Sequence, residues 1–114
     1  MRVVHRGETV ADTTRALRVV ESGPPAYYVP RADVLVTLER TATSTTCPWK
    51  GGATYWSLPG SPDAAWGYDD PMPDAEPLRH HVAFYASRVD ECWVDDIRAN
   101  AQPGGYYGGW ILPA

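Results

Sequence analysis

The stretch TCPWKGGATYWSL, residues 46–58, joins a tight loop to a run of alternating side chains. Successive side chains of an extended chain point to opposite sides, so the run from 53 to 58 has two faces. Thr54, Trp56 and Leu58 share one face, and the alternate residues share the other. The pattern predicts a β-strand with one of its faces buried.

The segments that precede this strand are short and rich in Val, Thr and Leu. They predict strands at residues 2–5, 9–12 and 15–21, an extended piece at 26–30 and an exposed strand at 36–46. Arg6-Gly7-Glu8 predicts a hairpin turn between the first two strands. Residues 31–35 predict a single helical turn, because a proline precedes them and proline favours a helix N-terminus.

The segments that follow the strand are also short. Residues 59–77 contain five prolines and predict an ordered surface loop, with a strand only at residues 65–68. Two more strands are predicted at 81–85 and 91–94, and Asp95-Asp96 supplies a turn. No helical period of any length is present, so the chain is predicted to be all-β.

The length of 114 residues predicts one domain, residues 1–114, with a single modest core. Seven or eight short strands with frequent turns favour a sandwich, a barrel or a pair of crossed sheets. Hydrophobic residues make up 44% and charged residues 21% of the chain, which is an ordinary composition for a folded domain.

The charge balance argues against a nucleic-acid partner, because the net charge is −4 with ten basic and fourteen acidic residues. No run of about 18 apolar residues is present, so we expect no membrane span and no membrane partner. A cytoplasmic location is the simplest expectation.

Cys47 and Cys92 are too few for a disulfide framework or a four-cysteine zinc site. Free thiols are expected, although the sequence leaves a single bridge between them open. His80 and His81 are adjacent, so on a strand they face opposite sides and do not readily share a metal ion. We therefore expect no metal and no cofactor.

Four segments together resemble the bacterial family filed as domain of unknown function 427. They are residues 21–34 (ESGPPAYYVPRADV), 46–56 (TCPWKGGATYW), 65–68 (AWGY) and 108–110 (GGW). The resemblance covers nearly the whole chain. It implies a small all-β domain of the β-tent kind, in which two antiparallel sheets meet at an angle over a pocket, with at most one short helical turn.

The sequence departs from this family at two places. β-tent relatives often carry a four-cysteine zinc site, which two cysteines cannot supply. Asp95-Asp96 stands where the family usually has Asp-Gly, so we expect strain or a changed turn there. A nucleotidyltransferase label is sometimes attached to the family, but the chain has no motif that supports it.

The aromatic residues predict a binding pocket. Five Trp and seven Tyr give more ring surface than a core of this size needs, and several rings adjoin Gly or Pro. Lys50 is held in a tight turn, from which its ammonium can reach an anion or a carbonyl group. We predict a pocket for a small-molecule ligand, with rings in the wall and Arg31 and Lys50 at its polar ends. The predicted lining residues are Tyr28, Arg31, Trp49, Lys50, Trp66, Tyr68 and Trp110.

Other functions stay open at this point. The pocket belongs to a small hydrolase or group-transfer enzyme if Cys47 is a nucleophile or Asp33 is a general base, although no catalytic signature is present. A peptide-binding or chain-end-binding module is the third class. Arg18, Glu21, Arg31 and Asp33 are expected to form an ion-pair network around the loop at 24–34. The ligand and the oligomeric state are not predicted.

Overall fold

The computed structural model describes residues 1–21 and 23–113. Ser22, which belongs to the first family-like segment, and Ala114, which ends the predicted domain, lie outside the described residues. The strands are β1 (Arg2–His5), β2 (Glu8–Asp12), β3 (Leu17–Val19), β4 (Ala26–Pro30), β5 (Glu39–Cys47), β6 (Gly51–Leu58), β7 (Ser61–Gly67), β8 (His81–Phe84), β9 (Glu91–Val94), β10 (Ile97–Arg98), β11 (Asn100–Ala101) and β12 (Trp110–Ile111). The 3-10 turns are η1 (Arg31–Asp33), η2 (Pro73–Leu78) and η3 (Ala86–Arg88).

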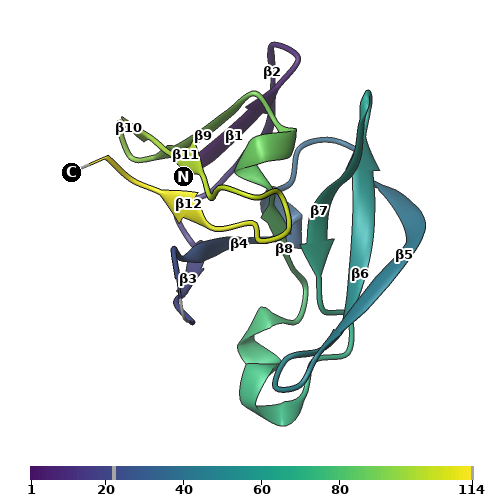
Figure 1. Ribbon diagram of the computed structural model, residues 1–114. Helices are drawn as coiled ribbons and strands as arrows, with labels where there is room; N and C mark the ends of the chain where they lie inside the picture. The colour runs from purple at the N-terminus through teal and green to yellow at the C-terminus, as the bar shows by residue number, and fades with distance from the viewer. Residues whose placement is uncertain (22, 114) are drawn as a thin grey trace.

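Within the described residues the strands form three sheets, and the strand pairs are antiparallel. A six-stranded sheet has the order β3-β4-β8-β7-β6-β5, a four-stranded sheet has the order β10-β9-β1-β2, and β11 pairs with β12. Figure 1 shows the four-stranded sheet on one side of the molecule and β5, β6 and β7 on the other. The prediction of a small all-β fold is confirmed.

The turns and strand lengths differ from the prediction in detail. The turn predicted at 31–35 is η1, but η2 and η3 are additional. Proline begins η2, where its fixed φ and missing N–H suit a first turn. β7 starts at Ser61, because Pro62 and the left-handed Asp63 (φ 49°) are accommodated at an irregular part of its pairing with β6.

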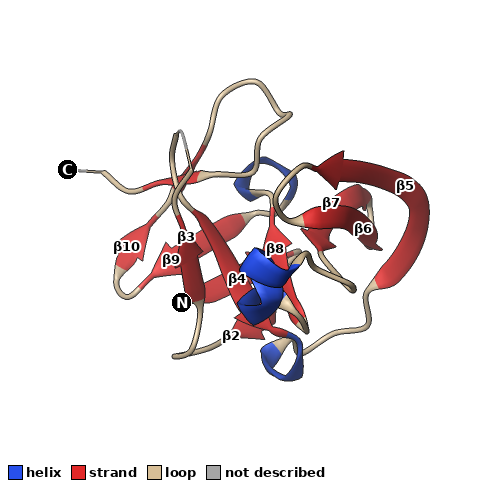
Figure 2. Cartoon of the chain, turned by 90° about the horizontal axis from the view of Figure 1, so that it is seen from below, coloured by secondary structure: helices blue, strands red, loops and turns tan. Residues whose placement is uncertain are grey.

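β5 is a long strand at the edge of the six-stranded sheet, and it curves along one side of the molecule (Figure 2). Its register against β6 shifts between Arg40 and Ser44. At this bulge the hydroxyls of Thr41 and Thr43 each donate to the Asp63 carboxylate, at 2.6 Å. At the bulge, side chains of β5 therefore contact β7, which lies on the other side of β6.

Both faces of the six-stranded sheet are buried, whereas the sequence predicted burial of only one face of β6. Trp56 and Leu58 pack in one apolar cluster, and Ala53 and Tyr55 pack in another on the opposite face. The four-stranded sheet covers the first face. Its contribution to that cluster is Val3, Val10, Ala11 and Cys92.

The turn between β9 and β10 contains the departure from the family pattern. Asp95 has a φ of 54°, a left-handed conformation that aspartate tolerates better than most residues. Asp96, which stands where the family usually has glycine, does not have a positive φ, so the strain expected from its substitution is not seen at that residue. No helix of the described residues has the length and apolar character needed to cross a bilayer.

Trp110 on β12 connects the C-terminal segment to the first cluster. Its side chain is fully buried, its ring lies 5.0 Å from that of Tyr27, and its Nε1 donates to the carbonyl of Phe84 at 2.8 Å. Because its backbone N–H also donates to Pro25, the tryptophan fixes β12 across β4 and β8.

We expect Trp110→Ala to lower the free energy of unfolding by about 3–5 kcal/mol, because it leaves a large cavity and an unpaired Phe84 carbonyl. Urea denaturation measures the change. Ile97→Ala, at a side chain exposed on β10, is the control and is expected to change stability by no more than about 0.5 kcal/mol. Equal midpoints for the two variants would contradict the structural role of Trp110.

Candidate functional site

A pocket of about 460 Å³ opens on the face of the six-stranded sheet that the four-stranded sheet does not cover. Its wall contains five rings of the second cluster, contributed by three strands of the sheet and by residues that directly follow β7 and β8. These rings are Tyr28, Tyr55, Trp66, Tyr68 and Tyr85. The sheet therefore gives the site an aromatic floor.

The remaining wall comes from loops at the pocket edge. These residues are Val19, Glu21, Gly23, Pro24, Ala26, Thr45, Thr46, Cys47, Pro48, Lys50, Gln102, Tyr106, Tyr107, Gly108 and Gly109. They come from the β3–β4 loop with the strand residue at each of its ends, from the end of β5 with its turn into β6, and from the segment between β11 and β12. Three connections far apart in the sequence thus meet at one site.

Lys50 is buried in the turn between β5 and β6, with only 7% of its surface exposed. Gly51 follows it at a φ of 107°, which favours glycine, and the Lys50 carbonyl accepts a hydrogen bond from Met72. The ammonium lies 5.4 Å from the ring centres of both Trp49 and Tyr68. The turn therefore holds a cation at the aromatic wall.

Glu21 neutralises this cation from the β3–β4 loop. Its Oε1 accepts a hydrogen bond from Lys50 Nζ, and its Oε2 accepts one from Trp49 Nε1 at 3.0 Å. Burial raises the pKa of Glu21, but the hydrogen bonds from Lys50 and Trp49 outweigh it and hold the pKa below its usual value. Burial lowers the pKa of Lys50, but the hydrogen bond with Glu21 and the electrostatic effects of Tyr28, Glu21 and Cys47 together outweigh it and raise the pKa. The two groups form an ion pair at neutral pH.

Three of the tyrosine hydroxyls in the pocket wall have hydrogen-bond partners. Tyr28 accepts a hydrogen bond from Trp66 Nε1 at 3.3 Å, and the hydroxyl of Tyr55 lies 3.0 Å from that of Thr45. The Tyr85 hydroxyl donates to the Tyr106 carbonyl at 3.4 Å, a long contact. These bonds orient the rings that line the pocket.

Tyr68 differs from these three tyrosines. Its side chain is only 6% exposed, yet its hydroxyl makes no hydrogen bond with the described residues. Burial raises its pKa strongly, and the electrostatic effects of Tyr28, Cys47 and Tyr55 raise it further. All three of those groups line the pocket, so a neutral hydroxyl faces this space with its donor free.

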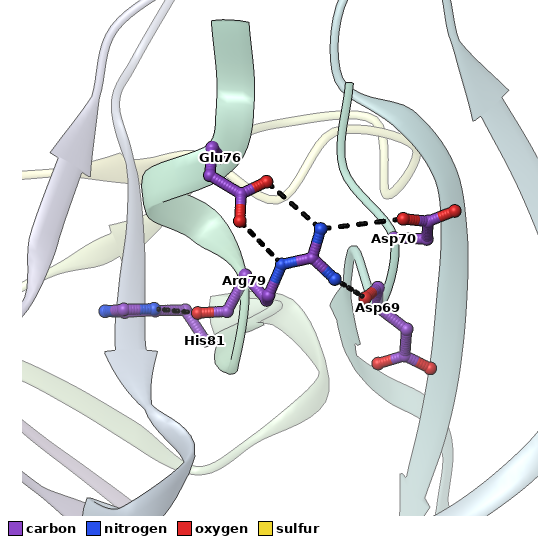
Figure 3. A network of polar contacts seen from close by, with 5 residues as sticks. All are labelled: Asp69, Asp70, Glu76, Arg79 and His81. Atoms are coloured by element: carbon purple, nitrogen blue, oxygen red, sulfur yellow. Dashed lines mark hydrogen bonds and ion pairs between the residues drawn. The ribbon is translucent and has the colours of Figure 1, made fainter. Parts of the chain in front are cut away.

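The residue after Tyr68 is held from two sides. Arg79 Nη1 donates to the Asp69 carbonyl at 3.0 Å, and Thr54 Oγ1 donates to its carboxylate at 3.2 Å. Figure 3 shows the Arg79 guanidinium between Asp69 and Glu76, with which it makes two hydrogen bonds, at 2.7 and 3.0 Å. This network fixes the backbone that carries the Tyr68 ring into the pocket.

The structure brings four of the seven predicted site residues into the pocket wall: Tyr28, Lys50, Trp66 and Tyr68. Trp49 lies beside the pocket, where it contacts Glu21 and lines a smaller apolar groove between β3 and η2. Its ring is 40% exposed. Trp49 thus meets Lys50 and Glu21 at the edge of the site but is not among the residues that line the pocket.

Arg31 and Trp110 were predicted in the pocket and lie elsewhere. The Arg31 guanidinium lies 4.8 Å above the ring of Trp56, which belongs to the opposite face of the sheet. Trp110 is also in the cluster on that face. The prediction that Trp49, Lys50, Trp66, Tyr68 and Trp110 line one concavity is therefore wrong, because strand pairing places these rings on different sides of one sheet.

The predicted charged network is also divided. Glu21 pairs with Lys50, whereas Asp33 accepts hydrogen bonds from Thr13 at 2.7 Å and Arg15 at 3.1 Å. The hydrogen bond from Thr13 holds the pKa of Asp33 below its usual value. Asp33 does not line the pocket, so it cannot be the general base of that site.

Tyr55, Tyr85, Gln102, Tyr106 and Tyr107 line the pocket but were not among the predicted site residues. The alternation of side chains assigned Tyr55 to one face of its strand. The two C-terminal tyrosines lie between two pairs of glycines. Neither signal indicates which loop meets which face, because this depends on pairing between distant strands.

Both cysteines are free, and they occupy different environments. Cys47 lines the pocket, whereas Cys92 is buried in the first cluster, where burial raises its pKa to about 12. Among residues 1–21 and 23–113, no three His, Cys, Asp or Glu side chains gather as a candidate metal site.

The ion pair predicts a pH dependence of stability. Because the pKa of Glu21 is lowered by folding, its contribution is complete above the ordinary carboxyl range and is lost as the pH falls through its folded value. We expect wild type to lose more unfolding free energy than Glu21→Gln between about pH 6 and about pH 3. Urea midpoints against pH test this, with the exposed Glu8→Gln as control. Parallel curves for wild type and Glu21→Gln would refute it.

Comparison with known proteins identifies the family of the chain. The family model described as domain of unknown function (DUF427) matches residues 1–95, and its short name, NTP_transf_9, carries the nucleotidyltransferase label. A search of curated proteins found no match. Since the matched range covers most of the 114 residues, the chain belongs to the family described as domain of unknown function DUF427.

Proposed function

We propose that this protein is a small-molecule-binding domain whose ligand occupies the aromatic pocket and presents a carbonyl or anionic oxygen to Tyr68 and Lys50. The observation that carries the proposal is the Tyr68 hydroxyl, which belongs to a largely buried side chain in the pocket wall, has no partner among the described residues and is still accessible. Because packing already fixes the Tyr68 ring, a ligand acceptor can bind this free donor with little loss of conformational freedom.

Lys50 supplies the second donor. An ammonium has three N–H groups, and its hydrogen bond to Glu21 uses one of them. The Tyr68 ring lies beside this ammonium, so one ligand oxygen can approach both donors. The volume of about 460 Å³ also lies within the range of ligand pockets in proteins, about 300–1,000 Å³.

The arrangement of charges favours an oxygen acceptor over a cationic ligand. An aromatic cage binds a cation through the faces of its rings. Here Lys50 lies over the rings of Trp49 and Tyr68, and the Arg88 guanidinium lies 4.0 Å above Tyr85. Because cations of the protein already occupy these faces, an added cation gains little and meets like charge.

The net charge and the cysteines bear on the ligand class and the location. The net charge of −4 supports a ligand other than nucleic acid. The free thiols of Cys47 and Cys92 support a reducing, cytoplasmic location.

A second candidate is an enzyme that uses Cys47 as a nucleophile. The observation in its favour is that Cys47 lines the same pocket as Lys50, whose charge lies close enough for the two groups to interact. A nearby ammonium favours the thiolate. The binding proposal needs only the donors and the rings, whereas the enzyme also needs a reactive sulfur.

The binding proposal predicts which fragments occupy the pocket. The test is a series of nitrogen–proton NMR titrations with small carboxylate, amide and amine compounds of matched size. We expect the carboxylate and amide compounds to shift the backbone N–H signals of Tyr28, Trp66 and Tyr68. Amines are expected to leave them unchanged. Hits that cluster elsewhere, or no hits in the pocket, would overturn the proposal.

Two variants test the roles of the donors. Tyr68→Phe keeps the ring and should weaken the best carboxylate by about 1 kcal/mol, roughly fivefold. Lys50→Met keeps the apolar stem and should weaken it by about 1.5–3 kcal/mol, roughly 10- to 100-fold. Arg31→Met, outside the pocket, is the matched control for loss of a cation and should have no effect.

The alkylation rate of Cys47 separates binder from enzyme. We expect iodoacetamide to react with Cys47 no faster than with an ordinary free cysteine near neutral pH, because no histidine is among the described residues that line the pocket. A rate far above that of free cysteine, which falls in Lys50→Met, would favour the enzyme. Cys47→Ser, with buried Cys92 retained, gives the background rate.

A further inference from the structure

The segment between β11 and β12 forms one edge of the pocket and has a closed base. Gln102 N donates to the Gly109 carbonyl at 3.0 Å, and Gly109 N donates to Gln102 Oε1 at 3.1 Å. The two strands pair directly outside this base. Residues 102–109 are therefore a short loop, the tyrosine loop, which Figure 1 shows reaching across the molecule toward β7 and β8.

Two glycines allow the base of the tyrosine loop to lie directly against the pocket wall. A Cβ added at Gly108 would lie 2.2 Å from Cη2 of Trp66, and one added at Gly109 would lie 2.7 Å from the Pro24 carbonyl. These contacts require glycine. Arg88 Nη2 also donates to the Gly105 carbonyl at 2.9 Å. The position of the loop relative to the ring of Trp66 is thus set by the backbone.

The same loop keeps two large rings in water. Tyr106 is 72% exposed and Tyr107 is 63% exposed, and both line the pocket. Their ring centres lie 4.8 Å apart, and the ring planes are nearly perpendicular, at 88°. Two perpendicular rings give a flat molecule one face to stack on and one edge to meet.

We propose that Tyr106 and Tyr107 are ligand-contacting residues that select a flat, unsaturated end on the bound molecule. This inference rests on the proposed function. The oxygen of the ligand meets Tyr68 and Lys50 at the inner wall, and its other end lies against the tyrosine loop. The ligand class is then an aromatic or heteroaromatic carboxylate or amide.

Phenylacetate and cyclohexylacetate test the inference. They have similar sizes and the same carboxylate, but only phenylacetate is flat and has a π face. We expect wild type to bind phenylacetate about 3- to 10-fold more tightly than cyclohexylacetate in NMR titrations, the range for an aromatic pair. Nuclear Overhauser contacts from the phenyl protons to the rings of Tyr106 and Tyr107 are also expected.

The double variant Tyr106→Leu, Tyr107→Leu should abolish this preference while it keeps apolar bulk at the loop. Both side chains are exposed, so the fold should persist, and the exposed Ile97→Leu is the control. Equal binding of the two acids by wild type, or an unchanged preference in the double variant, would overturn the inference and leave the proposed function standing. Failure of wild type to bind either acid would also overturn this inference. The proposed function is tested separately by the titrations with carboxylates, amides and amines.

Discussion

The six-stranded sheet has apolar side chains on both faces, but another sheet covers only one of them. A chain of 114 residues has enough strands for one covering sheet. In that sheet, β1, β2 and β9 contribute Val3, Val10 and Cys92 to the buried cluster. The other face is bordered by turns and loops, which leave a space above the rings. The pocket is the consequence of this imbalance, and its aromatic floor is the second face of the sheet.

Loops contribute few apolar contacts of their own, so polar contacts are needed to hold them over this face of the sheet. The Glu21 and Lys50 pair supplies one by joining the β3–β4 loop to the turn after β5. Arg79 supplies another beside Tyr68, and Arg88 holds the tyrosine loop through Gly105. Isolated surface ion pairs contribute little to stability, so the value of these contacts lies in fixing the geometry around the pocket.

The sequence predicts the elements better than it predicts the site. Alternation over residues 53–58 identifies β6, since a period of two depends only on local geometry. Trp66 and Trp110 both adjoin glycine in similar contexts, yet one lines the pocket and the other fills the opposite cluster. Glu21 and Lys50 lie 29 positions apart, so their pairing follows from strand order. Local pattern therefore finds the rings and the lysine, but topology decides which of them meet.

The range matched by the family model ends before the pocket is complete. Residues 1–95 contain Lys50, Tyr68 and the rings of the sheet, whereas the tyrosine loop lies beyond that range. The later segment is nonetheless part of the fold, because Trp110 is fully buried against Tyr27. Core packing thus anchors a loop that carries exposed rings to the edge of the site. Under the proposed function, a change in the loop would alter which molecules fit the pocket without a change in the core or in the inner donors.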